Sequence, residues 1–191
     1  MSDVLTEQQV LAARLGSWDR DISPNFRYNA TDAAIGQRLI GLEGTPQAVQ
    51  TLWRLRDQLT DHAYWFFLGT LWVSYSGYSD LKLWRTMLLS GRKKRKTSLM
   101  KPSEVGAYDR LPVHITAYRA HRAGETDWIS YTLDYATAVR FANERHVQEI
   151  AEYRMHKRDV IALFMRRGEQ ELLALWPKNA RLVVVHAVQG M

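Results

Sequence analysis

The chain has 191 residues, of which 46% are hydrophobic and 24% are charged, and its net charge is +6. These values are ordinary for a globular protein, and the length fits one domain or a domain with a helical extension. The chain has no cysteine, which excludes disulfides, thiolate metal sites and a thiol nucleophile. Its first ten residues are polar and its longest apolar run, 63–75, is too short to span a bilayer. We therefore expect a soluble, cytoplasmic protein without a signal peptide or a membrane partner.

Residues 1–110 have the pattern of a helical region. Short helices are predicted at residues 6–15 and 32–42, with an irregular segment between them. Residues 92–110 are basic and polar, and they are predicted to be a connector in which Ser103-Glu104 starts one helical turn. This composition shift divides the chain into a helical region, 1–110, and a β-rich domain, 111–191.

Three clearer helices are predicted inside the first region, after the capping residues Thr45, Thr60 or Asp61, and Asp80. Short turns join them, so we expect them to pack as a helical bundle. The middle helix, 62–74, is apolar on nearly all sides and should lie centrally. Its tryptophans, including Trp72, are interpreted as packing residues.

A basic run, Arg92 to Lys96, follows the third of these helices. Such a run can bind a phosphate backbone electrostatically, which makes a nucleic-acid-binding or interaction module without catalysis an alternative function. The other interpretation is a solvated loop after a helix.

From Leu111 onward the chain is rich in β-branched and aromatic residues. Six strands are predicted, at residues 113–120, 128–132, 150–156, 160–165, 171–175 and 182–188. One amphipathic helix, capped by Asp134 and reaching about Arg145, lies between the second and third strands. The expected class is therefore α+β.

Three polar clusters interrupt these strands. The first is Tyr118-Arg119, in which the guanidinium suits a phosphate group. The second is Ser130-Tyr131-Thr132, whose two hydroxyl groups alternate onto one face. The third is Glu169-Gln170-Glu171, whose two carboxylates should also share a face and would repel each other unless a cationic ligand lay between them.

These clusters lie in the runs YRAHRAGETDWISYTLDYATAVRFANERH and KRDVIALFMRRGEQELLALWP. In this order they resemble the Arg-Ser-Glu class of mono-ADP-ribosyltransferases, and most of all its small bacterial and phage members. The resemblance covers residues 111–188. It implies an ADP-ribosyltransferase-like split β-sandwich after the helical bundle, and an enzyme that moves ADP-ribose from NAD to a macromolecular acceptor.

The resemblance also implies the site. Arg119 would hold the NAD phosphates or the adjoining ribose, and Ser130 would orient the nicotinamide-side ribose and support the glutamate. Tyr118, Tyr131 and Thr132 would complete the NAD-binding wall. Glu171 would be the catalytic glutamate, and Glu169 would position or deprotonate the acceptor. NAD is the expected co-substrate and no metal is required.

The acceptor stays open between a protein side chain and RNA or DNA. Two arginines, Arg166 and Arg167, precede Glu169 and would attract a phosphate-bearing acceptor rather than an arginine. A toxin-like enzyme that hydrolyses NAD would use the same residues with water as the acceptor. A toxic activity would also demand an inhibitory partner protein.

Overall fold

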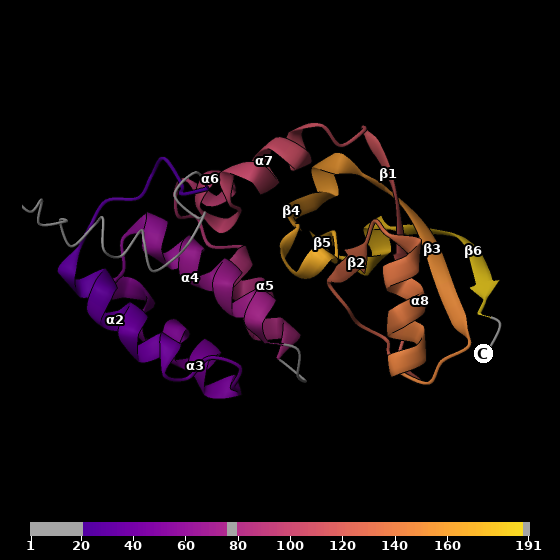
Figure 1. Cartoon of the computed structure of the whole chain (residues 1–191), viewed down its shortest axis with the longest axis horizontal. Helices are drawn as coiled ribbons and strands as arrows, with labels where there is room; N and C mark the ends of the chain where they lie inside the picture. Colours follow the sequence, from indigo (N-terminus) through magenta and orange to yellow (C-terminus); the bar gives the residue numbers. More distant parts are fainter. Residues whose placement is uncertain (1–20, 76–79, 189–191) are drawn as a thin grey trace, which may run out of the picture.

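The structure is a computed structural model that describes residues 21–75 and 80–188. Within these residues the fold is α+β, with seven α-helices and one six-stranded antiparallel sheet. Most of the helices gather on one side of the sheet, and a single helix, α8, lies on the sheet itself (Figure 1). The helix predicted at residues 6–15 and the turn predicted at 76–79 lie outside the described residues. No helix in the described ranges has both the length and the apolarity that crossing a membrane requires.

The predicted helices are confirmed with small shifts of their ends. The described helices are α2 (Ala30–Ile40), α3 (Pro46–Leu55), α4 (Asp61–Ser74), α5 (Leu81–Leu88), α6 (Arg95–Leu99), α7 (Pro102–Asp109) and α8 (Tyr135–Glu144). Three predicted caps are present, because the side chains of Thr60, Asp80 and Asp134 accept hydrogen bonds from the first turns of α4, α5 and α8. Thr45 is different, since its hydroxyl donates to the carbonyl of Leu42 instead of capping α3.

The connector predicted over residues 92–110 is more helical than expected, because α6 and α7 occupy most of it; the helical turn predicted at Ser103-Glu104 lies in the first turn of α7. Glu104, in the first turn of α7, accepts a hydrogen bond from the backbone N–H of Lys101 at 2.8 Å and so closes that turn. The basic run is also partly engaged within the protein. Arg92 donates to the carbonyl oxygens of Arg56 and Leu59, and Lys96 pairs with Asp109. Local capping and pairing therefore convert a polar stretch into helix.

All six predicted strands are present. They are β1 (His114–Arg119), β2 (Ser130–Thr132), β3 (Glu149–His156), β4 (Val160–Phe164), β5 (Glu171–Ala174) and β6 (Arg181–Ala187), in the order β4-β5-β2-β1-β3-β6. β1 and β3 pair along their whole length, from His114 to Arg119 on β1. By contrast, β1 and β2 pair only at Tyr118 and Thr132. The pairing between neighbouring strands is thus least extensive at the centre of the sheet, between the strands that carry Arg119 and Ser130.

One hydrophobic core runs from the helices into the sheet and crosses the predicted boundary at residue 110. The central place predicted for α4 is confirmed, since Trp65 and Leu68 are fully buried. At Gly69 the backbones of α4 and α6 come so close that a Cβ atom would lie 2.5 Å from the carbonyl oxygen of Leu99. This packing holds α4 close to α6, which in turn contacts β4 of the sheet.

Candidate functional site

A cavity of about 860 Å³ lies between the C-terminal end of α4 and the strands β1, β2 and β5. Four of the predicted site residues line it: Arg119, Ser130, Glu169 and Glu171. They come from the end of β1, the start of β2, the turn before β5 and the start of β5. Positions up to 52 residues apart in the chain therefore meet in one space because β2 pairs with both β1 and β5.

Arg119 is only 8% exposed, and its guanidinium is nearly saturated with hydrogen bonds. Nε and Nη2 donate to the two carboxylate oxygens of Glu125 at 3.0 and 2.6 Å. Nη1 donates to the carbonyl oxygen and the hydroxyl of Ser130 at 2.8 and 3.1 Å. A guanidinium has five N–H groups, so these two pairs of bonds leave one for a ligand. An arginine can bind a phosphate through two parallel N–H donors, but Arg119 already uses such a pair of donors to bind Glu125.

Glu125 is a site residue that the sequence analysis missed. Burial acts to raise its pKa, but hydrogen bonds from His121 and Arg119 outweigh burial and lower the pKa to about 2. The imidazole of His121 continues the network, with Nδ1 at 2.9 Å from Glu125 and Nε2 at 2.8 Å from the hydroxyl of Tyr153. Glu125 follows Gly124, whose φ is +71°, in the loop after β1. That loop has no periodicity to mark a functional carboxylate, and its only signal is an acid near a strand arginine.

Glu171 has a different environment, because no cation among residues 21–75 and 80–188 forms a salt bridge with it. Its Oε2 accepts a hydrogen bond from the indole Nε1 of Trp72 at 3.0 Å. The pKa of Glu171 is raised to about 7, and burial is the largest cause. The charge of Glu169 also acts to raise it, whereas the hydrogen bond from Trp72, the nearby hydroxyl of Ser130 and the charge of Arg119 act in the lowering direction. The result is a carboxyl group that exchanges its proton near neutral pH, a property typical of catalytic acids and bases.

Trp72 was interpreted from its spacing as a packing residue; the structure confirms that interpretation and adds a second role at the cavity. It does pack, with its ring 4.9 Å from that of Trp84. It also lines the cavity and donates to Glu171. Helical spacing shows which face of α4 the indole occupies, but it does not show where the N–H points.

Glu169 lies in the turn before β5 and not on the strand. Gln170 has a φ of +45°, so the alternation that was predicted to place Glu169 and Glu171 on one strand face is wrong. Both glutamates line the cavity nevertheless. Glu169 accepts a hydrogen bond from Arg140 of α8 at 3.3 Å. Of the two arginines in this turn, Arg166 is bound to Glu104, and only Arg167 lines the cavity.

The other predicted residues lie outside the cavity lining. Thr132 is buried, and its hydroxyl donates to the carbonyl oxygen of Glu169 at 2.6 Å, which fixes the turn that carries this glutamate. Tyr131 is buried in the core, with its ring 5.4 Å from that of Tyr153. Tyr118 packs edge-to-face on Tyr135 of α8, at 5.3 Å. Among these three residues, Thr132 supports the site and the two tyrosines build the surrounding structure.

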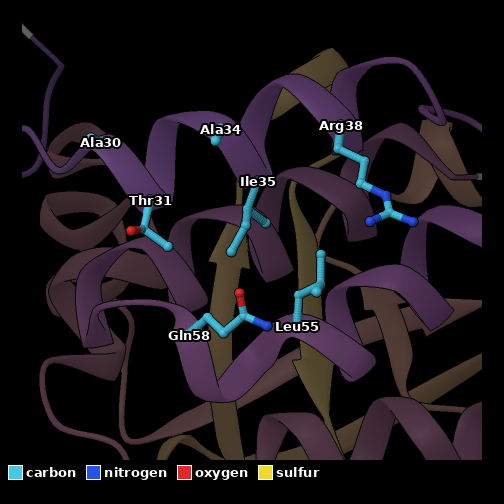
Figure 2. Close-up of a pocket in the computed structure, with 7 residues that line it drawn as sticks. All are labelled: Ala30, Thr31, Ala34, Ile35, Arg38, Leu55 and Gln58. Atoms are coloured by element: carbon cyan, nitrogen blue, oxygen red, sulfur yellow. The ribbon is translucent and has the colours of Figure 1, made fainter.

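A second hollow, of about 440 Å³, lies far from this cluster in the sequence (Figure 2). It is bounded by α2 and by the end of α3 with the turn after it. In Figure 2, Ile35, Leu55 and Gln58 point toward one another. Arg38 is the only charged side chain in its lining, so it offers no pair of groups for acid–base or nucleophilic chemistry.

Comparisons with known proteins add no relative: no protein-family model matches the chain, and no match was found among curated proteins or solved structures.

Proposed function

We propose that the cavity binds NAD and that the protein transfers ADP-ribose to a macromolecular acceptor and releases nicotinamide. The observation that carries the proposal is the meeting of Arg119, Ser130 and Glu171, from three different strands, in one cavity, where Arg119 donates to the hydroxyl of Ser130 and Trp72 donates to Glu171. An arginine, a serine and a glutamate in this order are the residues on which the resemblance to the Arg-Ser-Glu transferases rests. The volume is within the range of small-molecule sites.

The sheet offers secondary support. Its single β1–β2 pairing, at Tyr118 and Thr132, separates the strands β4-β5-β2 from β1-β3-β6. A sheet that is nearly divided at this point is what we expect of a split β-sandwich. The residues proposed for catalysis, Ser130 and Glu171, begin the strands on one side of this division, and Arg119 ends a strand on the other.

Cleavage of the nicotinamide–ribose bond leaves its electron pair on nicotinamide and develops positive charge on the ribose, as in glycoside cleavage. The ionised carboxylate of Glu171 stabilises that charge, and it does so most strongly in the transition state. Trp72 holds the carboxylate through a hydrogen bond, and the hydroxyl of Ser130 lines the cavity beside it. The acceptor then attacks the anomeric carbon, and Glu169 accepts the proton that the acceptor loses.

Arg119 retains one N–H for the ligand, which suits a single ribose or phosphate oxygen. Arg167, without an ion pair among the described residues, lies in the same wall beside Glu169 and would favour an acceptor that carries phosphate. Both a nucleic acid and a protein side chain remain acceptors to be tested.

The test is incubation of the purified protein with labelled NAD, alone, with cell lysate and with RNA. We expect label to move to a macromolecule, and its sensitivity to protease or nuclease names the acceptor class. Arg119→Ala should weaken NAD binding in the same preparation. Release of nicotinamide without labelled macromolecule would identify an NAD hydrolase, and no turnover of NAD under any of these conditions would contradict the proposal.

A further inference from the structure

Arg145 is a partly buried arginine in the cavity wall whose charge is not matched by a bound carboxylate. It follows the last residue of α8, and its Nη1 donates to the carbonyl oxygen of Ala120, just beyond β1. Within residues 21–75 and 80–188, no acid forms a salt bridge with it. One hydrogen bond among five N–H groups leaves four donors unassigned. Among the described residues, Arg145 thus has the unbonded guanidinium N–H groups that Arg119 lacks.

Like charges surround this guanidinium. The pKa of Arg145 is lowered to about 10, mainly by burial and then by the nearby charges of Arg119 and Arg122. Glu125 and Glu144 act in the opposite direction, but more weakly than burial and the two arginines. Glu125 is itself committed to Arg119. A buried cation in such surroundings favours an anionic ligand, because the ligand replaces the missing counter-charge.

We propose that Arg145, assisted by Arg122, binds the diphosphate group of the dinucleotide, and that Arg119 positions Ser130 instead of gripping the phosphates. The choice of a dinucleotide rests on the proposed function, whereas the anion site itself rests on the donors of Arg145. Arg122 lines the cavity with a side chain that is 58% exposed, and its Nη1 lies 3.9 Å from Glu125. It is therefore free to turn toward a ligand that Arg145 already holds.

Arg145 also has a structural role that the test must separate. It ends α8, where the helix dipole favours a cation, and it joins α8 to the end of β1. Both roles need one charge and one donor, which a lysine supplies. Only diphosphate binding needs the planar fork with several donors. Arg145→Lys is thus the informative variant, and Arg145→Gln is the more severe one.

The experiment is calorimetric titration of the full chain with ADP-ribose and, separately, with inorganic pyrophosphate. We expect Arg145→Lys to weaken ADP-ribose binding about tenfold and Arg145→Gln about a hundredfold, because the fork and then the charge are lost. Arg122→Gln should weaken it about threefold, as expected for an exposed charge. Arg158→Gln removes an exposed charge outside the cavity lining and should bind as the wild type does. Circular dichroism and thermal melting check the folding of each variant.

Binding of ADP-ribose to Arg145→Lys and Arg145→Gln within about twofold of the wild type would overturn the proposal, as would a wild type that binds neither probe. If Arg145→Gln fails to fold, Arg145→Lys and Arg122→Gln decide the question. Nicotinamide release by the wild type separates this proposal from the proposed function. Binding that depends on Arg145 without NAD turnover keeps the diphosphate site and refutes the transferase. NAD turnover together with ADP-ribose binding that does not depend on Arg145 supports the transferase and refutes the diphosphate site.

Discussion

Glu104 in the helical region and Glu171 in the sheet are two shielded glutamates with opposite environments. Glu104 is 1% exposed and accepts four hydrogen bonds: from the backbone N–H groups of Lys101 and Met165, and from Nε and Nη2 of Arg166. Glu171 accepts a hydrogen bond from Trp72, forms no salt bridge with the cations that the structure describes, and lies near the charge of Glu169.

The difference separates a carboxylate that holds structure together from one that is available for chemistry. Glu104 joins α7 to the turn before β5, and its charge is fully matched. Glu171 begins β5, and its raised pKa shows that its charge is not matched. Two arginines show the same contrast, since Arg166 is paired with Glu104 and Arg145 has no carboxylate in contact among the described residues. Groups without a matching charge collect at the cavity, where a ligand would supply what is missing.

The largest expected effect comes from Glu171→Gln. We expect NAD turnover to fall by about 10²–10³-fold or more, because the charge that stabilises the transition state is lost. NAD affinity should stay within about twofold of the wild type, and the free energy of unfolding should change by less than about 1 kcal/mol. That limit on the unfolding free energy applies below about pH 4.5, where Glu171 is protonated in both states. Because the pKa of Glu171 is raised, the wild type loses stability as the pH rises from about 4.5 to about 7, and above pH 7 the variant should be the more stable of the two. Nicotinamide release measures turnover, and chemical denaturation measures stability.

Glu104→Gln is the matched control at the structural carboxylate. It leaves Arg166 without its counter-charge, and we expect the free energy of unfolding to fall by about 3 kcal/mol. Turnover per folded molecule should change far less than in Glu171→Gln, because Glu104 does not line the cavity. Urea denaturation and turnover at a temperature where the variant is folded give both values. A stable Glu104→Gln protein with lost activity would reverse the contrast between the two glutamates.

Glu125 provides a pH-dependent prediction of similar size. Its pKa of about 2 in the folded protein lies below its ordinary value of 4.5, so ionised Glu125 stabilises the fold above pH 4.5. That stabilisation, on the order of 3 kcal/mol, should be lost as the pH falls from about 4.5 to about 2. Glu125→Gln should flatten this part of the stability curve. If the variant loses as much stability as the wild type between about pH 4.5 and about pH 2, the Arg119–Glu125 pair does not stabilise the fold in solution.

Trp72→Phe should have the smallest effect. It keeps most of the packing against Trp84 and removes the indole N–H that donates to Glu171. Because that bond favours the ionised carboxylate, its loss should raise the pKa of Glu171 and reduce turnover at neutral pH by about three- to tenfold. Turnover should recover at higher pH, and a pH-independent loss would indicate disturbed packing instead.

Local signals in the sequence were sufficient for most of the fold. The caps at Thr60, Asp80 and Asp134 fixed the starts of three helices, and β-branched runs located all six strands. Helix α6 and the full length of α7 were not predicted, because the basic stretch from Arg92 has no hydrophobic residues at helical spacing. Its residues are stabilised by distant partners such as Leu59, and a single sequence does not reveal those contacts.

The candidate site was predictable to a smaller extent. Arg119, Ser130, Glu169 and Glu171 line one cavity, as their motifs indicated. Glu125 and the hydrogen bond of Trp72 were missed, because each depends on how a side chain is directed in three dimensions. The turn geometry before Glu171 was also missed, since the positive φ of Gln170 breaks a strand alternation that the residues alone favour.

The most direct test of the central claim is nicotinamide release from NAD by the wild-type protein, measured as kcat/KM from about pH 5.5 to about pH 8.5. We predict that kcat/KM rises with pH and reaches a plateau, with the midpoint of the rise near the pKa of Glu171, about 7, as the carboxylate ionises. We also predict that Glu171→Gln abolishes this rise. No nicotinamide release at any pH, or a profile that Glu171→Gln leaves unchanged, would contradict the assignment of the cavity as an NAD site with Glu171 at its centre.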